Sequence, residues 1–126
     1  MAIRTSEDVV RVRQTVREAA IAVGFTLVEQ TKVVTAASEL ARNALVHGGG
    51  GDLRLEVWNG QGPRGMRLVF EDKGPGIPDV ALALKEGYTT GNGLGLGLSG
   101  ARKLMSEFAI ESAVGRGTRV TVARWK

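Results

Sequence analysis

Cysteine is absent from the 126-residue sequence, and His47 is its single histidine. Without thiols the chain can form neither a disulfide nor a thiolate metal site, and one imidazole leaves no histidine cluster for zinc. A chain without cysteine suits a reducing compartment. We therefore predict a cytoplasmic protein with no metal site of its own built from cysteine or histidine.

Long apolar runs are also missing. No run approaches the roughly 20 residues that a membrane-spanning helix requires, and the opening MAIRTSEDVV lacks the apolar stretch of a signal peptide. We expect no association with a membrane. A length of 126 residues with 43% hydrophobic residues fits one domain with its own core, so residues 1–126 are predicted to be a single domain.

Aromatic residues are few, at 5% of the sequence, and give little surface for stacking nucleobases. Seventeen basic residues against thirteen acidic ones give a formal net charge of +4, which favours an anionic partner. Because the basic residues are scattered singly, we predict a nucleotide or an acidic protein surface as that partner, and no nucleic acid.

Two amphipathic helices are predicted in the first half of the chain. Ser6 is expected to cap a helix whose valines and alanines recur at helical spacing up to Gly24. Thr26 and Glu29 have the spacing of a capping box, which opens a second helix that runs to His47 before the four glycines at 48–51.

The rest of the chain alternates between strand and turn patterns. Strands are predicted at residues 53–58 and 66–70, with a Gly/Pro-rich turn between them, and again at 108–112 and 118–125, joined by the turn VGRG. A short helical stretch is expected at 80–84 and a longer helix from Leu98 to Phe108. Adjacent strands can pair here without crossover helices, so we predict an α+β fold with a mixed, mostly antiparallel sheet.

The glycine-rich stretch GNGLGLGLSGAR, residues 91–102, contains a G-x-G-x-x-G pattern at 95–100. A dinucleotide site would need a strand directly before these glycines, and only the helix after them is clearly predicted. The glycine loop of protein kinases would need a valine where Arg102 stands, and no P-loop pattern occurs in the chain. Taken alone, the match is weak, and a glycine-rich helix entrance that binds no ligand is an alternative explanation.

Glu39 and Asn43 are four residues apart in the second predicted helix, so their side chains share one helical face. Such a pair is usually an exposed hydrogen-bonded couple. The neighbouring alanines and leucine make this stretch apolar on most sides, which places at least one of the two in a protected cavity. There a carboxylate can act as a general base, and an amide oxygen can bind Mg²⁺ together with substrate phosphates.

The segment Asp72 to Gly76, DKGPG, follows an apolar strand. Its aspartate can accept a hydrogen bond from an exocyclic amine, and its glycines allow the backbone to pass close to a planar base. An ordinary turn explains the same residues equally well.

In this order the motifs resemble the boxes of the Bergerat ATP-binding fold of the GHKL superfamily, which includes gyrase, Hsp90, histidine kinases and MutL. The matching segments are 39–43, 72–76, 93–98 and 115–118. The chain also resembles RsbT-type serine/threonine kinases of bacterial partner-switching systems. The segments that carry this similarity are SELARN, EDKGPGIPD, LGLGLSGARKLMSEF and IESAVGRGT. This similarity extends over nearly the whole chain.

The resemblance implies a two-layer α/β sandwich in which helices cover one face of the sheet and ATP lies between the helices and a lid. It implies Glu39 as the catalytic residue, Asn43 as the Mg²⁺ ligand, and Asp72, supported by Thr118, as the partner of the adenine amino group. The full set implied to bind ATP is Asn43, Asp72, Gly74, Gly76, Ile77, Gly93, Leu94, Gly95, Leu96, Gly97 and Thr118. Asn92 stands where some relatives carry arginine, which leaves open which residue contacts the γ-phosphate.

The same resemblance implies partners. The substrate would be a serine or threonine of a small STAS-domain protein, and its phosphorylation would release the kinase to a downstream effector such as a PP2C-type phosphatase. The segment NALVHGG also resembles the anti-sigma-factor branch of the superfamily, so the alternative is a binding module that sequesters a sigma factor.

Overall fold

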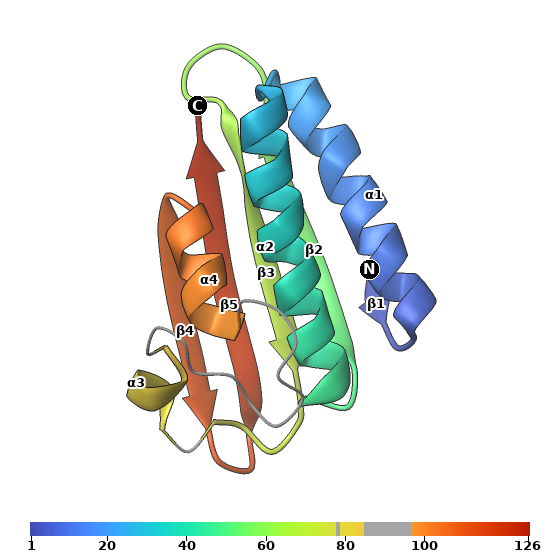
Figure 1. Cartoon of the computed structure of the whole chain (residues 1–126), viewed down its shortest axis with the longest axis vertical. Coiled ribbons are helices and arrows are strands. Elements are labelled where there is room, and N and C mark those ends of the chain that lie inside the picture. Colours follow the sequence, from blue (N-terminus) through green and yellow to red (C-terminus); the bar gives the residue numbers. More distant parts are fainter. Residues whose placement is uncertain (78, 85–96) are drawn as a thin grey trace.

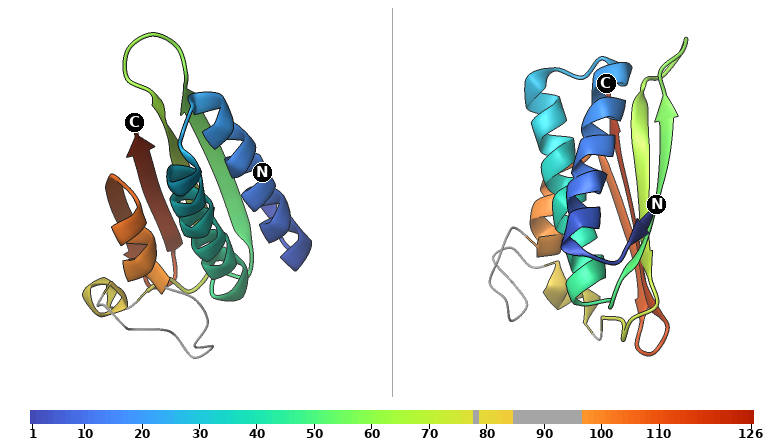
Figure 2. Two further views of the ribbon diagram at one scale, coloured as in Figure 1. Left: turned by 45° about the horizontal axis from the view of Figure 1, so that its top comes forward. Right: turned by 90° about the vertical axis from the view of Figure 1, so that its right-hand side faces the viewer.

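The computed structural model describes residues 1–77, 79–84 and 97–126. Three helices lie on one face of a five-stranded sheet, and no helix or strand of the described residues covers the other face (Figures 1 and 2). This two-layer α+β arrangement confirms the predicted fold class. In chain order the elements are β1 (Ala2–Ile3), α1 (Ser6–Val23), α2 (Leu27–Val46), β2 (Gly51–Trp58), β3 (Gly65–Asp72), the short α3 (Val80–Ala83), α4 (Gly97–Leu104), β4 (Glu107–Ala113) and β5 (Gly117–Trp125).

Helix α1 begins as predicted, but its cap is Thr5 and the prediction of Ser6 was wrong by one residue. The Asp8 N–H donates to Thr5 Oγ1 at 3.2 Å, and the Thr5 N–H donates to Asp8 Oδ2 at 3.1 Å. A reciprocal cap needs an acidic or amide side chain three residues after the capping residue. Asp8 meets this condition for Thr5, whereas the residue three places after Ser6 is Val9.

Helix α2 begins with the predicted capping box, in which Thr26 and Glu29 exchange hydrogen bonds. It ends at Val46 with His47 as its C-terminal cap, as the glycine run indicates. Three buried alanines in the middle of the helix, Ala36, Ala37 and Ala41, allow close packing, and α2 contacts α1, α4 and the sheet. The helix therefore holds its C-terminal end against one end of the sheet (Figure 1).

The sheet has the strand order β1-β2-β3-β5-β4, and every pairing between these strands is antiparallel. Both predicted hairpins, β2–β3 and β4–β5, are confirmed, with strands a residue or two longer than the patterns indicated. Phe70 and Val120 lie opposite each other with their side chains in the core, and Asp72 and Thr118 continue the same rows to the strand ends.

Helix α4 is shorter than predicted. Phe108 was predicted both to end this helix and to begin a strand; the helix was wrong and the strand is confirmed, because α4 ends at Leu104 and Phe108 lies in β4 opposite Val122. The spacing of Phe108 fits a helix that continues from Leu98, but pairing with β5 brings Phe108 against the same core from the sheet side. Tertiary pairing has here overridden a local pattern. Among the described residues, no helix is both long and apolar enough to cross a bilayer.

Candidate functional site

Asp72 and Thr118 form one wall of the predicted site. Asp72 is the last residue of β3, and Thr118, the second residue of β5, lies directly opposite it in the register. Opposite residues of an antiparallel pair point to the same side, and this is the side that the helices cover. The Gly74 N–H donates to Asp72 Oδ1 at 2.9 Å, which orients the carboxylate and leaves its second oxygen to accept from a ligand.

The chain just after α2 packs against this carboxylate. A methyl group on Gly48 would collide with the Asp72 side chain, and one on Gly74 would come within 2.6 Å of the Gly48 Cα. The Gly48 N–H donates to the Asn43 backbone oxygen at 3.3 Å. Glycine at 48 and 74 thus allows the end of α2 and the end of β3 to meet, and joins Asn43 to Asp72 through one intervening residue.

The loop after Asp72 is held by the β4–β5 turn. The Gly115 N–H donates to the Pro75 oxygen at 2.9 Å. Gly76 has φ 79° and lies against the Ala113 oxygen, and Gly117 has φ 92° and lies against the Asp72 oxygen. Both positions combine left-handed backbone with a close backbone neighbour, so they require glycine.

Ser112 connects the parts of this wall. Its Oγ accepts from the Ile77 N–H at 2.8 Å, lies 2.8 Å from Thr118 Oγ1, and contacts the Gly117 oxygen at 3.2 Å. One hydroxyl therefore links the loop that follows β3 to β4 and β5. The sequence analysis assigned no role to Ser112, because a serine in a strand carries no distinctive signal.

Glu39 and Asn43 lie one turn apart on α2, and both are half-buried; Leu40 and Ala44, which directly follow them, are buried. Within the described part of the chain, neither side chain forms a hydrogen bond or an ion pair. The His47 N–H donates to the Asn43 backbone oxygen at 2.9 Å, and α2 ends at Val46, three residues after Asn43. The pair is thus held at the end of α2 that meets β3, with its polar atoms available to a ligand.

The donor set at this end suits a metal bound mainly by a ligand. No group of three or more His, Cys, Asp or Glu side chains with metal-binding geometry occurs among residues 1–77, 79–84 and 97–126. Mg²⁺ commonly uses one or two protein oxygens and completes its shell with water and substrate phosphates. The single amide oxygen of Asn43 fits this mode of binding. The described residues do not form a set of side chains that would hold a metal without such a ligand.

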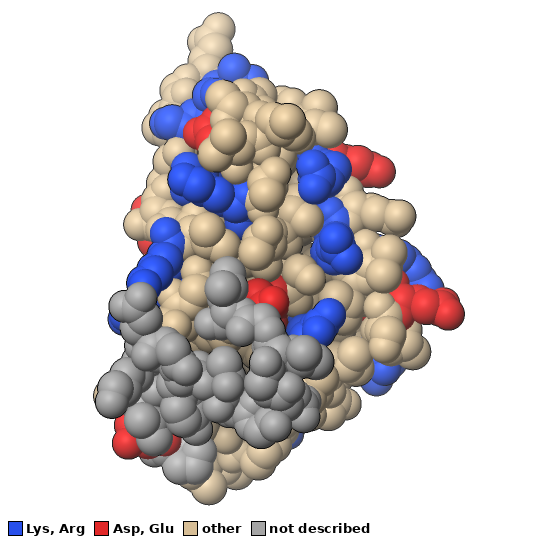
Figure 3. All heavy atoms as spheres, viewed as in Figure 1, with Lys and Arg blue, Asp and Glu red and all other residues tan. Residues whose placement is uncertain are grey.

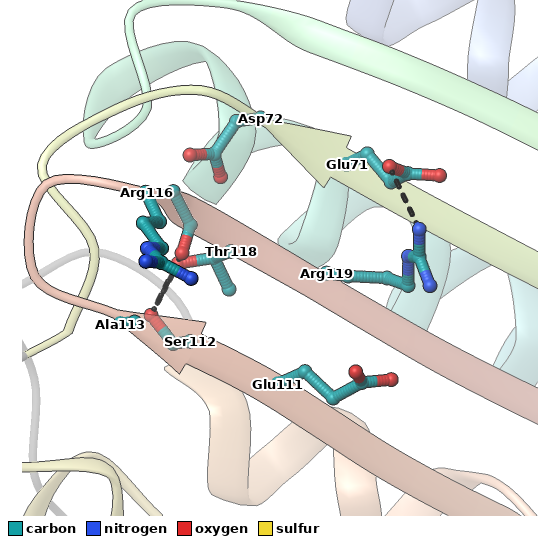
Figure 4. Close-up of a pocket in the computed structure, with 9 residues that line it drawn as sticks. Glu71, Asp72, Glu111, Ser112, Ala113, Arg116, Thr118 and Arg119 are labelled. Carbon is teal, nitrogen blue, oxygen red and sulfur yellow. Dashed lines mark hydrogen bonds and ion pairs between the residues drawn. The ribbon is translucent and has the colours of Figure 1, made fainter.

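A hollow of about 360 Å³ opens beside this wall, at the ends of β3, β5 and β4 (Figure 4). Asp72, Ser112 and Thr118 contribute to its lining from the helix side of the sheet. Glu71 and Arg119 contribute from the uncovered side, where their side chains lie 3.4 Å apart. Glu39 and Asn43 do not line it, so the hollow borders the predicted site without containing it.

The predicted lid falls largely outside the described residues. Gly93, Leu94, Gly95 and Leu96 lie in the segment that is not described, as does Asn92. Gly97 is the first residue of α4, and the buried Leu98 and Ala101 pack this helix into the core beside α2. Of the predicted set, the structure brings Asp72, Gly74, Gly76, Ile77 and Thr118 into one cluster, joined through Gly48 to the helix turn that carries Asn43.

Lys and Arg side chains are spread over the helix-covered face, with fewer acidic side chains between them (Figure 3). They include Arg42 of α2 and Arg102 and Lys103 in the last turn of α4. A surface of this sign attracts anions and acidic proteins.

Comparison with known proteins gives the following likenesses. Residues 28–126 match the family described as histidine kinase-, DNA gyrase B-, and HSP90-like ATPase. The chain is 41% identical to the serine/threonine-protein kinase RsbT of Bacillus subtilis (strain 168), over 98% of this chain and 92% of that protein. It is 31% identical to an anti-sigma F factor of Clostridium novyi (strain NT), over 79% of this chain and 73% of that protein.

Solved structures share the fold at lower identity. The structure of the RsbU and RsbW domains of a Mycobacterium tuberculosis protein superposes with a TM-score of 0.66 at 22% identity, and the match covers all of this chain but 32% of that one. A mycobacterial sensor histidine kinase, MprB, superposes with a TM-score of 0.60 at 18% identity, over 99% of this chain and 96% of that one.

Proposed function

Because the chain belongs to the histidine kinase-, DNA gyrase B-, and HSP90-like ATPase family, we propose that it is an ATP-dependent protein serine/threonine kinase of the partner-switching type. One observation carries the proposal. Asp72, which lies opposite Thr118 in the sheet, is packed against Gly48, just after the helix that bears Glu39 and Asn43. The 41% identity to a protein named as a serine/threonine kinase supports the same activity.

In the proposed complex, Asp72 accepts a hydrogen bond from the adenine amino group, and Thr118 lies beside it. Gly74, Gly76 and Ile77 bring the backbone close to the base. Gly93 to Gly97 would supply backbone amides to the phosphates, and the N-terminal end of α4 would add positive partial charge there.

Asn43 would hold Mg²⁺, which when bound neutralises phosphate charge during transfer. Glu39 would orient the serine or threonine hydroxyl of the substrate and accept its proton. The hydroxyl oxygen then bonds to the γ-phosphorus, while the bond from that phosphorus to the departing ADP oxygen breaks. Glu39 returns the proton to solvent, so that ADP and a phosphoprotein are the products.

The proposed substrate is a STAS-domain protein in the cytoplasm, and the proposed later partner is a PP2C-type phosphatase. A phosphate adds nearly two negative charges to the binding face of the substrate. Those charges must be desolvated or face acidic groups if the complex is to persist. Phosphorylation would therefore release the kinase to its second partner.

The second candidate function is an anti-sigma factor that sequesters a sigma factor. It is favoured by the identity to proteins named anti-sigma F factor, which extends over about three quarters of the chain. In this case ATP binding would support the fold of the binding surface, and phosphotransfer would be secondary.

The proposal is tested by phosphotransfer from labelled ATP, with Mg²⁺ and purified STAS-domain proteins as acceptors. Glu39→Ala should bind ATP within about threefold of the wild type and transfer phosphate about 10²- to 10⁴-fold more slowly, since a positioned base contributes that much. Glu18→Ala, at an exposed position of α1, is the matched control and should transfer normally.

Equal transfer rates for Glu39→Ala and the wild type would remove Glu39 from the mechanism. Transfer to no STAS protein, together with tight binding of a sigma factor, would favour the second candidate.

A further inference from the structure

The hydrogen bonds of Ser112 determine the direction of the bond that its neighbour Thr118 makes. A serine hydroxyl has one proton and two acceptor sites. The Ile77 N–H can only donate, so it occupies one acceptor site of Ser112 Oγ at 2.8 Å. The Gly117 carbonyl can only accept, so the contact at 3.2 Å uses the single proton of Ser112.

The contact between Ser112 Oγ and Thr118 Oγ1, at 2.8 Å, then falls on the second acceptor site of Ser112. Each of the three contacts has its own proton and its own acceptor site when Thr118 donates its proton to Ser112. A dashed line in Figure 4 marks the contact between the two hydroxyls. Thr118 is left with acceptor sites alone for a ligand.

We propose that Ser112 is a positioning residue that holds Thr118 as a hydrogen-bond acceptor and thereby favours 6-aminopurine nucleotides over 6-oxopurine nucleotides. This inference rests on the proposed ATP site. Asp72, opposite Thr118, presents a carboxylate. With Thr118 fixed, both polar side chains of this wall accept hydrogen bonds. They match an exocyclic amino group and place acceptors opposite the oxygen at position 6 of hypoxanthine or guanine.

Ser112→Ala tests the inference. It frees the Thr118 hydroxyl to rotate and donate to a 6-oxo group, and it removes the acceptor of the Ile77 N–H. Competition against a fluorescent nucleotide should show ATP binding about 3- to 10-fold weaker, the range expected for loss of one hydrogen bond. ITP, which carries oxygen in place of the 6-amino group, should weaken less, so the preference for ATP over ITP should fall by a similar factor.

Two further variants separate this role from general support of the loop. Thr118→Val, which has nearly the same shape without the hydroxyl, should lower the same preference. In the Thr118→Val background, Ser112→Ala should change it no further, because the hydroxyl through which Ser112 acts is gone. Ser112→Thr, which keeps a hydroxyl, should retain the wild-type preference. Thermal unfolding of each variant reports whether the fold is intact.

A Ser112→Ala protein that binds ATP and ITP with equally reduced affinity would overturn the inference, since that result assigns Ser112 only to support of the loop. An additional loss of preference in the Thr118→Val background would also overturn it. Failure of the wild type to bind ATP would instead contradict the proposed function, independently of Ser112.

Discussion

At the residue scale, Gly48 is where the chain that follows α2 packs against the Asp72 side chain. Gly48→Ala places a methyl group against the Asp72 side chain and within 2.7 Å of the Ala44 oxygen. We expect it to destabilise the fold by about 1–3 kcal/mol, as overpacking does, and to weaken ATP binding by displacing Asp72. Chemical denaturation and nucleotide titration measure the two effects.

Gly60→Ala provides the matched control, because a methyl group there meets nothing within 4 Å. It should leave both stability and ATP affinity unchanged. Normal ATP affinity in Gly48→Ala would show that the packing of Gly48 does not position Asp72.

Residues of the candidate site differ in how visible they are to sequence analysis. Asp72 and Asn43 were assigned because four motifs in a fixed order resemble the boxes of the GHKL superfamily, whereas each segment alone has an ordinary structural explanation. Gly48 is visible only as one glycine of a run that ends α2, since its contact with Asp72 joins residues 24 positions apart in the chain. The position of Ser112 beside Thr118 depends on the register of β4 with β5. Local sequence patterns do not specify that register.

At the element scale, the caps of α1 and α2 make stability depend on pH. The backbone N–H of Thr26 holds the pKa of Glu29 below its ordinary value of 4.5, and nearby Lys126 adds to this. The backbone N–H of Arg4 likewise lowers the pKa of Asp8 from 3.8. A carboxyl whose pKa is lower in the folded state stabilises the fold above its ordinary pKa, and this contribution is lost as the pH falls through the folded value.

Glu29→Ala should therefore lower the melting temperature clearly at pH 7, and the difference from the wild type should shrink as the pH falls below about 4.5. Glu18→Ala, at an exposed helical position without a cap, should show little difference at either pH. Thermal melts across this pH range decide the matter. A difference that stays constant or grows on acidification would mean that the Glu29 carboxylate does not stabilise the cap.

Element boundaries show where sequence patterns succeed and where they fail. The Thr26–Glu29 box and the two hairpins were predicted because local chemistry specifies them. The end of α4 was not predicted correctly. Phe108 can be buried either in a continued helix or in a strand that pairs with β5, and the chain forms the strand. Which of the two forms depends on a contact that is distant in the sequence.

At the scale of the whole molecule, nucleotide binding should stabilise one end more than the other. The end of α2, the loop after β3 and the β4–β5 turn lie together, while the β2–β3 loop and the C-terminus lie at the opposite end (Figure 1). ATP at 100 times its Kd should raise the free energy of unfolding by about 2.7 kcal/mol.

Hydrogen exchange measured under native conditions resolves this effect by position. On ATP addition, protection should increase most for the amides of Gly74, Ile77 and Gly115, whose acceptors lie within the candidate site. The amide of Lys126, bonded to the Arg64 oxygen at the other end, is the internal reference. Equal protection at both ends would place the nucleotide elsewhere or indicate only global stabilisation.

The central claim is that Asp72 binds the adenine of ATP, and calorimetric titration with ATP and Mg²⁺ tests it most directly. Asp72→Asn exchanges one acceptor oxygen for an amide donor, so ATP affinity should fall by about tenfold or more. Asp52→Asn, a change at an exposed carboxylate in the neighbouring strand β2, should bind ATP as the wild type does. Equal ATP affinity in Asp72→Asn and the wild type would contradict the account.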